Sequence, residues 1–424
     1  MSRSAGSFTV LLVLLLTACG VTQPTVTPAG LPTTATETPL ATPPASTPSP
    51  PDSLTLWLAP AFAPETGSAA GELLAERLAG FERSHPGVVL LVRVKGEAGP
   101  GGLLDSLTTA SQAAPDTLPD LVTLNGAALF AATLKGLVAP LDGLVEMPGE
   151  PAWYPYAITA ALVDGGFFGV PFAADAEAMA YRSDVYDSAP STWTDIVTGP
   201  APFLIPAADP TAAFTLAQYL SLGGSLLDDA GRPDLEADVL AEVLGFYAAA
   251  RTQGVLPLSA RQVADPAATW AALRDGRALA AVAPFRAFLE AHDPATDSIQ
   301  PFPTFDGLGI CFADPWSWAL VTRDSARQEL AAELLNWLMD PGFLGPWSRA
   351  LGLLPTTRAA LSQWPEDTEA ALANRLVTSA RPRPSIEILT VYGPSLQAAV
   401  ASVLNGEATP DAAAQAAALQ IRMP

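Results

Sequence analysis

Side chains that usually carry catalysis or bind metal ions are scarce in this sequence. Its 424 residues include only two cysteines and two histidines, so a disulfide framework is excluded. His85 and His292 show no metal-ligand spacing and have no cysteine beside them, so a Ser-His-Asp or Cys-His nucleophile is not expected. The sequence also lacks a glycine-rich phosphate loop of the P-loop type. We predict no metal site and no cofactor.

Positive charge is scarce as well. The chain has 21 Lys and Arg residues against 43 Asp and Glu residues, a formal net charge of −22. A surface of that sign repels nucleic acids and anionic lipid headgroups, which excludes both as partners of the folded body. Hydrophobic residues make up 49% of the sequence and charged residues 15%, so the chain can bury large cores. Its length fits two lobes of ordinary size better than one.

The N-terminus has the pattern of a secretory signal. Residues 1–18 carry a positive charge at Arg3, continue as an apolar run too short for a membrane span, and end in small residues. The ending Leu16-Thr17-Ala18-Cys19 resembles the lipobox of bacterial lipoproteins. That resemblance implies cleavage before Cys19 and lipidation of its thiol, and the alternative is an ordinary signal with a chance cysteine. Two or three acyl chains would anchor the protein stably to a membrane.

The segment after the predicted anchor differs in composition from the rest of the chain. Residues 19–53 are dominated by Pro and Thr and carry almost no charge. Such a segment cannot bury a core and predicts an extended, semi-rigid tether. We therefore expect the folded body to stand off the outer face of the cytoplasmic membrane.

From residue 54 onward, short apolar strands alternate with helices. This order predicts an α/β fold with a mostly parallel sheet, in which ligands bind at the carboxyl ends of strands. Residues 88–94 are β-branched and apolar, which predicts a buried strand. The other predicted strands cover residues 54–58, 121–124, 170–172, 179–181, 278–282 and 310–321, and the helices cover 71–84, 105–114, 127–135, 214–223, 235–254, 265–275, 325–339 and 393–405.

The stretch from Gly169 to Tyr186 organises the rest of the chain. It predicts two short strands on either side of a crossing at residues 173–176, and Asp175 is the one charge in that small, apolar crossing. A carboxylate there must be hydrated, hydrogen-bonded or offered to a ligand. A solvated hinge aspartate is the alternative to a ligand-binding one.

Several short motifs occur in an order that resembles family 1 of the extracellular solute-binding proteins of ABC importers, the group that includes maltose-binding protein. The resemblance covers the chain from about residue 54 to the C-terminus, and each motif alone is weak. They are Pro119-Asp120-Leu121-Val122 with residues 136–141, residues 169–172 with Tyr181-Arg182-Ser183-Asp184, residues 276–278 with Pro284-Phe285, Gly352-Leu353-Leu354-Pro355, and residues 404–410.

The resemblance implies a two-lobed periplasmic-binding-protein fold of type II with three crossings between the lobes. The crossings are expected near residues 173–175, 314–317 and 354–357. The N-terminal lobe would contain residues 54–173 plus 318–353, and the C-terminal lobe residues 174–317 plus 354–424. A monomer of this kind would capture a sugar between its lobes and deliver it to an ABC permease in the membrane.

The resemblance also implies candidate ligand-binding residues. Asp175 would accept hydrogen bonds from sugar hydroxyls, and Phe285 stands where the family often has a tryptophan that stacks on a pyranose. Asn125 and Trp57 end strands whose following loops face the ligand, and Tyr392 falls near a position that tends to be aromatic.

Two further candidates are Trp316, from strand geometry, and Glu177, from its position near Asp175. If Trp316-Ser317-Trp318 is a strand, both rings face one side, and Trp316 is the better candidate because it is nearer the crossing. Glu177 is a second carboxylate close to Asp175.

Two other functions remain open at this point. A lipid-anchored glycosidase would need two acids roughly 5–10 Å apart. Asp175 and Glu177 could serve together only if the chain is strand-like there, and Asp314 is the one acid evident at another crossing. A sensor or scaffold that no longer transports is favoured by the loop at residues 59–66, which lacks the polar residues common at that point of the family.

Overall fold

The computed structural model describes residues 53–64, 67–147 and 149–422. The predicted signal, Cys19 and the linker up to residue 52 lie outside the described residues. The first strand begins at Ser53, the last residue of the predicted linker and one residue before the predicted start of the strand.

One large mixed sheet runs through the described part of the chain. Its main path follows the order β2-β1-β3-β10-β6-β8-β7, and three further strands pair with β6 or β10. Strands β1, β2 and β3 are parallel, whereas β10 is antiparallel to both β3 and β6. The bounds are β1 (Ser53–Leu58), β2 (Val89–Val94), β3 (Leu121–Asn125), β6 (Val170–Arg182), β7 (Phe203–Leu204), β8 (Ala280–Pro284), β9 (Asp297–Gln300), β10 (Cys311–Leu320), β11 (Leu354–Pro355) and β12 (Ala380–Pro382), with β4 (Leu162–Val163) and β5 (Gly166–Phe167) in a separate pair.

Helices connect these strands, as the alternating pattern predicts. Most begin at a side-chain cap; the Thr192 hydroxyl, for example, accepts from the Asp195 backbone at the start of α5 in a complete capping box. Their bounds are α1 (Ala69–Ser84), α2 (Leu103–Ala113), α3 (Gly126–Leu134), α4 (Pro155–Ala161), α5 (Trp193–Thr198), α6 (Ala213–Ser221), α7 (Ala237–Thr252), α8 (Pro266–Arg274), α9 (Phe285–Ala291), α10 (Ser325–Leu338), α11 (Pro341–Ala350), α12 (Arg358–Leu361), α13 (Thr368–Ser379), α14 (Ile386–Asn405) and α15 (Pro410–Arg422).

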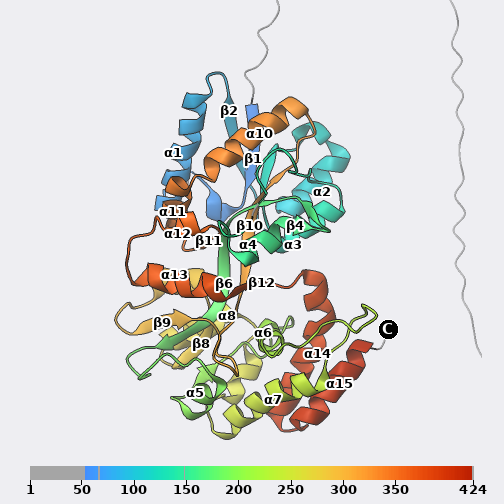
Figure 1. Ribbon diagram of the computed structural model, residues 1–424, viewed down its shortest axis with the longest axis vertical. Helices are drawn as coiled ribbons and strands as arrows, with labels where there is room; N and C mark the ends of the chain where they lie inside the picture. The colour runs from blue at the N-terminus through green and yellow to red at the C-terminus, as the bar shows by residue number, and fades with distance from the viewer. Residues whose placement is uncertain (1–52, 65–66, 148, 423–424) are drawn as a thin grey trace, which may run out of the picture. The chain divides into compact units, whose positions relative to one another are not determined.

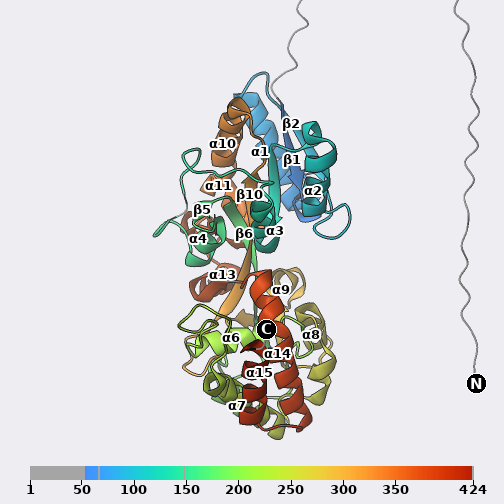
Figure 2. The same ribbon diagram turned by 90° about the vertical axis from the view of Figure 1, so that its right-hand side faces the viewer.

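Three hydrophobic cores divide the elements. The first core joins β1, β3, α1, α10 and α11, and the elements packed on it form the first lobe. The second core lies among α6, α7, α14 and α15, where α14 and α15 pack side by side (Figure 2). The third core joins β8, α8, α9 and α13, and with the second it supports the second lobe. Tyr156 of α4 packs into the third core, although its range was predicted to belong to the N-terminal lobe.

Three neighbouring strands pass from the first lobe to the second. On β6, residues up to Ala173 belong to the first core and Ala174 already belongs to the third. β10 changes core between Ala313 and Trp316, and the chain at β11 changes between Leu353 and Leu354. β6 pairs with both β10 and β11, and Figure 1 shows β6 and β10 running together between the two groups of elements. The three crossings predicted from the resemblance are confirmed.

Two predicted strands and the crossing between them are one strand. β6 runs without interruption from Val170 to Arg182. The crossing was expected to separate two short strands, but Ala173 and Ala174 pair with β11 on one side and β10 on the other. The backbone hydrogen bonds of two neighbouring strands therefore hold the segment extended, in spite of its low strand propensity.

The strand predicted at residues 88–94 is present as β2, but the prediction that it is buried is wrong. Among the described strands, β2 stands at the end of the sheet order and pairs with β1 alone, and Val89, Leu91 and Val94 are 37%, 45% and 48% exposed. β-branched residues are enriched in strands of either kind, so composition alone did not distinguish an edge from a centre.

Helix α14 begins at Ile386, seven residues before the predicted start at Gly393. The expected helix began at Gly393 with Pro394 in its first turn, but Pro394 lies inside the helix. A Cβ at residue 393 would lie 2.3 Å from the Pro210 carbonyl oxygen, so only glycine allows this close approach to the neighbouring segment. By length and composition α14 could cross a membrane, but its buried side chains belong to the second core.

Candidate functional site

Two adjoining cavities lie beside the crossing strands. The first, the polar chamber, has a volume of about 310 Å³. The second, the apolar chamber, has a volume of about 420 Å³ and shares Asp314 and Arg383 with the first. The polar chamber is lined by Ala61, Glu97, Asp175, Ala176, Glu177, Asp265, Pro266, Pro284, Arg286, Phe312, Asp314, Trp316, Leu353 and Arg383.

The register of β6 and β10 brings the acids of the polar chamber together. Asp175 lies directly opposite Asp314, and Glu177 lies opposite Phe312. Because side chains alternate along a strand, Asp175 and Glu177 point to the same face of β6. The strand-like geometry that a shared role of these two acids required is therefore present.

Asp175 receives hydrogen bonds from the backbone and stands at the start of a helix. Its Oδ1 accepts from the amide of Ala176 at 2.8 Å and from the amide of Arg286, in the first turn of α9, at 3.0 Å. Burial raises the pKa of Asp175 to about 6, although those two N–H groups partly offset the shift. The carboxylate is thus held in position but incompletely compensated for the loss of water.

Arg383 connects the acids of the polar chamber. Its guanidinium forms an ion pair with Glu177, and its backbone amide donates to the Ala313 carbonyl at 2.8 Å, next to β12. Burial acts to lower the pKa of Arg383, but the Glu177 and Asp314 carboxylates outweigh it, so the pKa is raised. Burial likewise raises the pKa of Asp314, against the Arg383 charge and the Gly126 amide, which lies 3.3 Å from Asp314 Oδ1. The guanidinium therefore remains charged between two acids.

Trp316 supplies an aromatic side chain to the polar chamber. It is 9% exposed and lines the cavity. The ring of Phe62 meets it edge to face, with 5.0 Å between the ring centroids. Trp318, two residues further along β10, is fully buried in the first core, so the preference for Trp316 agrees with the geometry.

Phe285 and Trp57 lie in cores and not in either chamber. Phe285 is fully buried in the third core, and the stacking face predicted for it is corrected accordingly: its ring is covered on all sides by protein. Trp57 is 2% exposed in the first core, with the Lys95 ammonium 4.2 Å from its ring centroid. Both residues lie close to strand ends, but Trp57 packs into the first core and Phe285 into the third.

Asn125 also has a structural role. Its side-chain oxygen accepts from the Ala128 amide at 2.9 Å and caps α3. It lies opposite Trp316 on the neighbouring strand but does not line either chamber.

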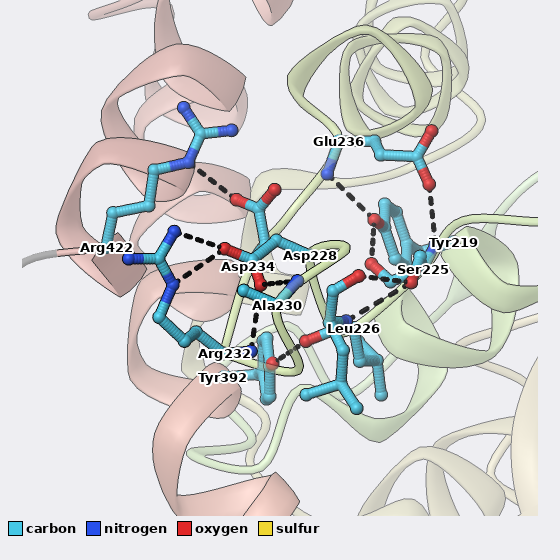
Figure 3. Close-up of polar contacts among 11 residues, drawn as sticks. Tyr219, Ser225, Leu226, Asp228, Ala230, Arg232, Asp234, Glu236, Tyr392 and Arg422 are labelled. Atoms are coloured by element: carbon cyan, nitrogen blue, oxygen red, sulfur yellow. Dashed lines mark hydrogen bonds and ion pairs between the residues drawn. The ribbon is translucent and has the colours of Figure 1, made fainter.

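Tyr392 lies in a polar network of the second lobe, away from both chambers. Its hydroxyl donates to the Leu226 carbonyl, and the same loop is held by Asp228 with Arg232 and by Asp234 with Arg422 (Figure 3). The side chain fixes the loop before α7 against α14, so the ligand-binding role predicted for it is corrected as well.

Arg383 and Arg286 were both absent from the predicted site residues, although both line the polar chamber. The one local signal for Arg383 is a cation between two prolines, Pro382 and Pro384, after a helix. Asp314 had been noticed as an acid at a crossing. Among the described residues, no group of three or more His, Cys, Asp or Glu side chains is arranged to hold a metal ion.

The chain belongs to the bacterial extracellular solute-binding proteins, whose family model matches residues 76–373. This is a family of binding proteins, and the chain is not an enzyme. A Brucella abortus protein described as a binding protein is 28% identical over 138 residues. That match covers 31% of this chain, and the chain spans only about a third, 32%, of the length of such curated relatives.

Solved structures share the fold. A cyclic α-maltosyl-1,6-maltose binding protein of Arthrobacter globiformis is 19% identical, with a TM-score of 0.70 over 88% of this chain and 98% of that one. The sugar-binding protein MalE of Xanthomonas citri is 22% identical, with a TM-score of 0.70 over 87% and 96%. Such likeness establishes the two-lobed periplasmic-binding fold of the mixed α/β type.

Proposed function

We propose that the protein captures a sugar or oligosaccharide between its two lobes and delivers it to an ABC permease. The observation that carries this proposal is the convergence of Asp175, Glu177 and Trp316 in one cavity. A sugar site needs hydrogen-bond acceptors for hydroxyls beside an apolar or aromatic wall. Several proteins with the same fold are described as maltose or maltodextrin binders, which supports a ligand of this class.

The charges of the polar chamber favour a neutral ligand over an anionic one. Five carboxyl groups line it, whereas the cations are Arg286 and Arg383. Arg286 is already paired with Glu290 and Arg383 with Glu177. An anionic ligand would meet the remaining acids at short range, and like charges repel strongly where water is partly excluded. Sugar hydroxyls can instead donate to Asp175.

Two lobes joined by three adjacent strands favour a hinge that closes on the ligand. We expect the radius of gyration in solution scattering to decrease when a binding sugar is added at saturation. An unchanged radius would argue for a rigid module. The lobe boundaries given above and a monomeric state belong to the same proposal.

Lipid anchoring through Cys19 completes the proposed function, with the protein on the outer face of the cytoplasmic membrane. The support is the Leu-Thr-Ala-Cys sequence after an apolar run. A Cys19→Ala variant expressed in a bacterial host should be released from the membrane fraction. Equal membrane binding of variant and parent would contradict the anchor.

The test of sugar binding is a panel of neutral mono- and oligosaccharides, measured by thermal shift and then by titration calorimetry. At least one should raise the melting temperature and bind reversibly. Asp175→Asn should weaken that binding, while Asp238→Asn, an exposed acid in the first turn of α7, should not. The absence of any shift across the panel would contradict the proposal and favour a sensor or scaffold.

A further inference from the structure

We propose that the ligand of this protein is a glycoside with an apolar substituent, whose sugar lies in the polar chamber and whose substituent lies in the apolar chamber. The inference rests on the proposed sugar-binding function and names the class of its ligand. It follows from the chemistry of the second chamber, which differs from that of the first.

The walls of the apolar chamber are predominantly aliphatic. They come from α3, α4 and the segment that leads into α14. Phe130 is the one aromatic side chain among the lining residues, so a pyranose could not be stacked between two rings. The aliphatic lining includes Ala127, Leu162, Val163, Ile386, Ile388 and Leu389.

Each hydroxyl group that lines the apolar chamber already takes part in a hydrogen bond within the protein. Thr159 donates to the Pro155 carbonyl at 3.1 Å, and Thr211 donates to Asp209. Ser385 accepts from the Ile388 amide at 3.5 Å as the cap of α14. A second sugar ring in this chamber would therefore bury several hydroxyls with few partners, and each unpaired one is unfavourable. A hydrocarbon group would meet no such cost.

The two chambers adjoin closely enough for one ligand. Asp314 and Arg383 line both of them, so the charged groups stand at the junction and not deeper in the apolar chamber. A glycosidic oxygen placed at the junction would have the Arg383 guanidinium as a donor. The apolar surface that the substituent would bury includes Ile386, which is 46% exposed.

The experiment compares methyl and hexyl glycosides of the same sugar by titration calorimetry. The β-D-glucopyranosides and β-D-maltopyranosides are used first, followed by the glycoside pair of whichever panel sugar binds best, all below the micelle concentration. Each buried methylene is worth a factor of about four in affinity. With about half of the added chain covered, the hexyl glycoside should bind about thirtyfold more tightly than the methyl glycoside.

A matched pair of variants locates the effect. Ile386→Asn combined with Ala127→Asn makes the apolar chamber polar at two exposed positions. Val391→Asn combined with Ala412→Asn makes the same change at exposed positions outside both chambers. The first double variant should lose about tenfold of the hexyl preference and keep its methyl glycoside affinity. The second should retain the preference, and melting temperatures establish that both are folded.

The possible outcomes separate this inference from the proposed function. Equal binding of methyl and hexyl glycosides, or tighter binding of a trisaccharide than of the hexyl glycoside, overturns the apolar substituent and leaves sugar binding intact. A hexyl preference that is the same in both double variants also overturns it, because the chain would then bind elsewhere. If no sugar or glycoside binds, the proposed function itself fails.

Discussion

Asp120, which directly precedes β3, and Asp175, which lies within β6, have similar sequence surroundings but different partners in the structure. Each follows a short apolar or small-residue segment and precedes another. Asp120 is 2% exposed, accepts from the Thr55 amide at 2.7 Å and is paired with the forked guanidinium of Arg327. Asp175 is half-buried, accepts two backbone N–H groups and, among the described residues, forms no ion pair.

The difference lies in what satisfies the charge. At Asp120 a cation from α10, 207 residues away in sequence, closes the site and joins two elements of the first lobe. At Asp175 the remaining hydrogen-bonding capacity faces a cavity beside Glu177 and Trp316. A carboxylate whose hydrogen bonds and charge are satisfied within the protein contributes to stability. A carboxylate with unused acceptor capacity at a cavity is available to a ligand.

The largest expected effect concerns Phe285, one residue from the amide that binds Asp175. Phe285→Ala should lower the free energy of unfolding by about 3–5 kcal/mol, because it leaves a cavity in the third core. Denaturant unfolding with an unchanged m-value would measure this loss. A variant of full stability whose sugar affinity has collapsed would contradict the core assignment and restore the stacking role.

Asp120→Asn should have the next largest effect. Replacing the carboxylate removes the charge that Arg327 pairs with and should cost about 2 kcal/mol of unfolding free energy, since hydrogen bonds to charged groups are worth about 1.5–3 kcal/mol each. The sugar affinity of the folded Asp120→Asn protein should equal that of the parent. Asp238→Asn serves as the exposed control, and equal stability of the two variants would remove the contrast between Asp120 and a surface acid.

Asp175→Asn should show the opposite pattern. Loss of a charged acceptor should weaken sugar binding by about 1.5–3 kcal/mol, or about ten- to a hundredfold. Calorimetry measures the affinity, and the ligand-free melting temperature is the companion readout. Unchanged affinity would contradict the ligand-binding role and leave Asp175 as a solvated hinge residue.

The pH dependence sharpens the same comparison with a smaller effect. Because the pKa of Asp175 is raised to about 6 in the fold, the folded state holds this proton more tightly than the unfolded chain. The stability that Asp175 contributes is present below about pH 4 and is lost as the pH rises through 6. The melting temperature of the Asp175→Asn variant minus that of the parent should therefore increase as the pH rises from 4 to 7.5.

Ligand binding should change in the other direction. The ionised carboxylate is the better acceptor for sugar hydroxyls, so the affinity of the parent should fall as the pH drops through about 6. The Asp175→Asn variant should lose most of this dependence, and the remainder would belong to Asp314, whose pKa is also raised. A parent affinity that is flat between pH 5 and 7.5 would contradict the role of the Asp175 charge.

Much of the organisation is contained in local sequence patterns. The order of strands and helices was predictable, because helical periodicity, caps and glycine stops are short-range signals. The three crossings were predicted from the family resemblance, and Asp175, Glu177 and Trp316 stay predictions that the shared cavity supports. Asp175 was recognisable because a charge in a run of alanines needs a reason. These features depend on residues within a few positions of one another.

Burial and partnership were decided only by the tertiary structure. Phe285, Trp57 and Tyr392 had sequence surroundings as favourable as those of Trp316, yet packing directs their rings into cores and leaves Trp316 at a cavity. Arg383 contacts Glu177, 206 residues away in sequence, and β2 is an exposed edge because no other described strand pairs with its outer side. Composition determines that an aromatic ring or a charge is present, but long-range strand register determines which surface it faces.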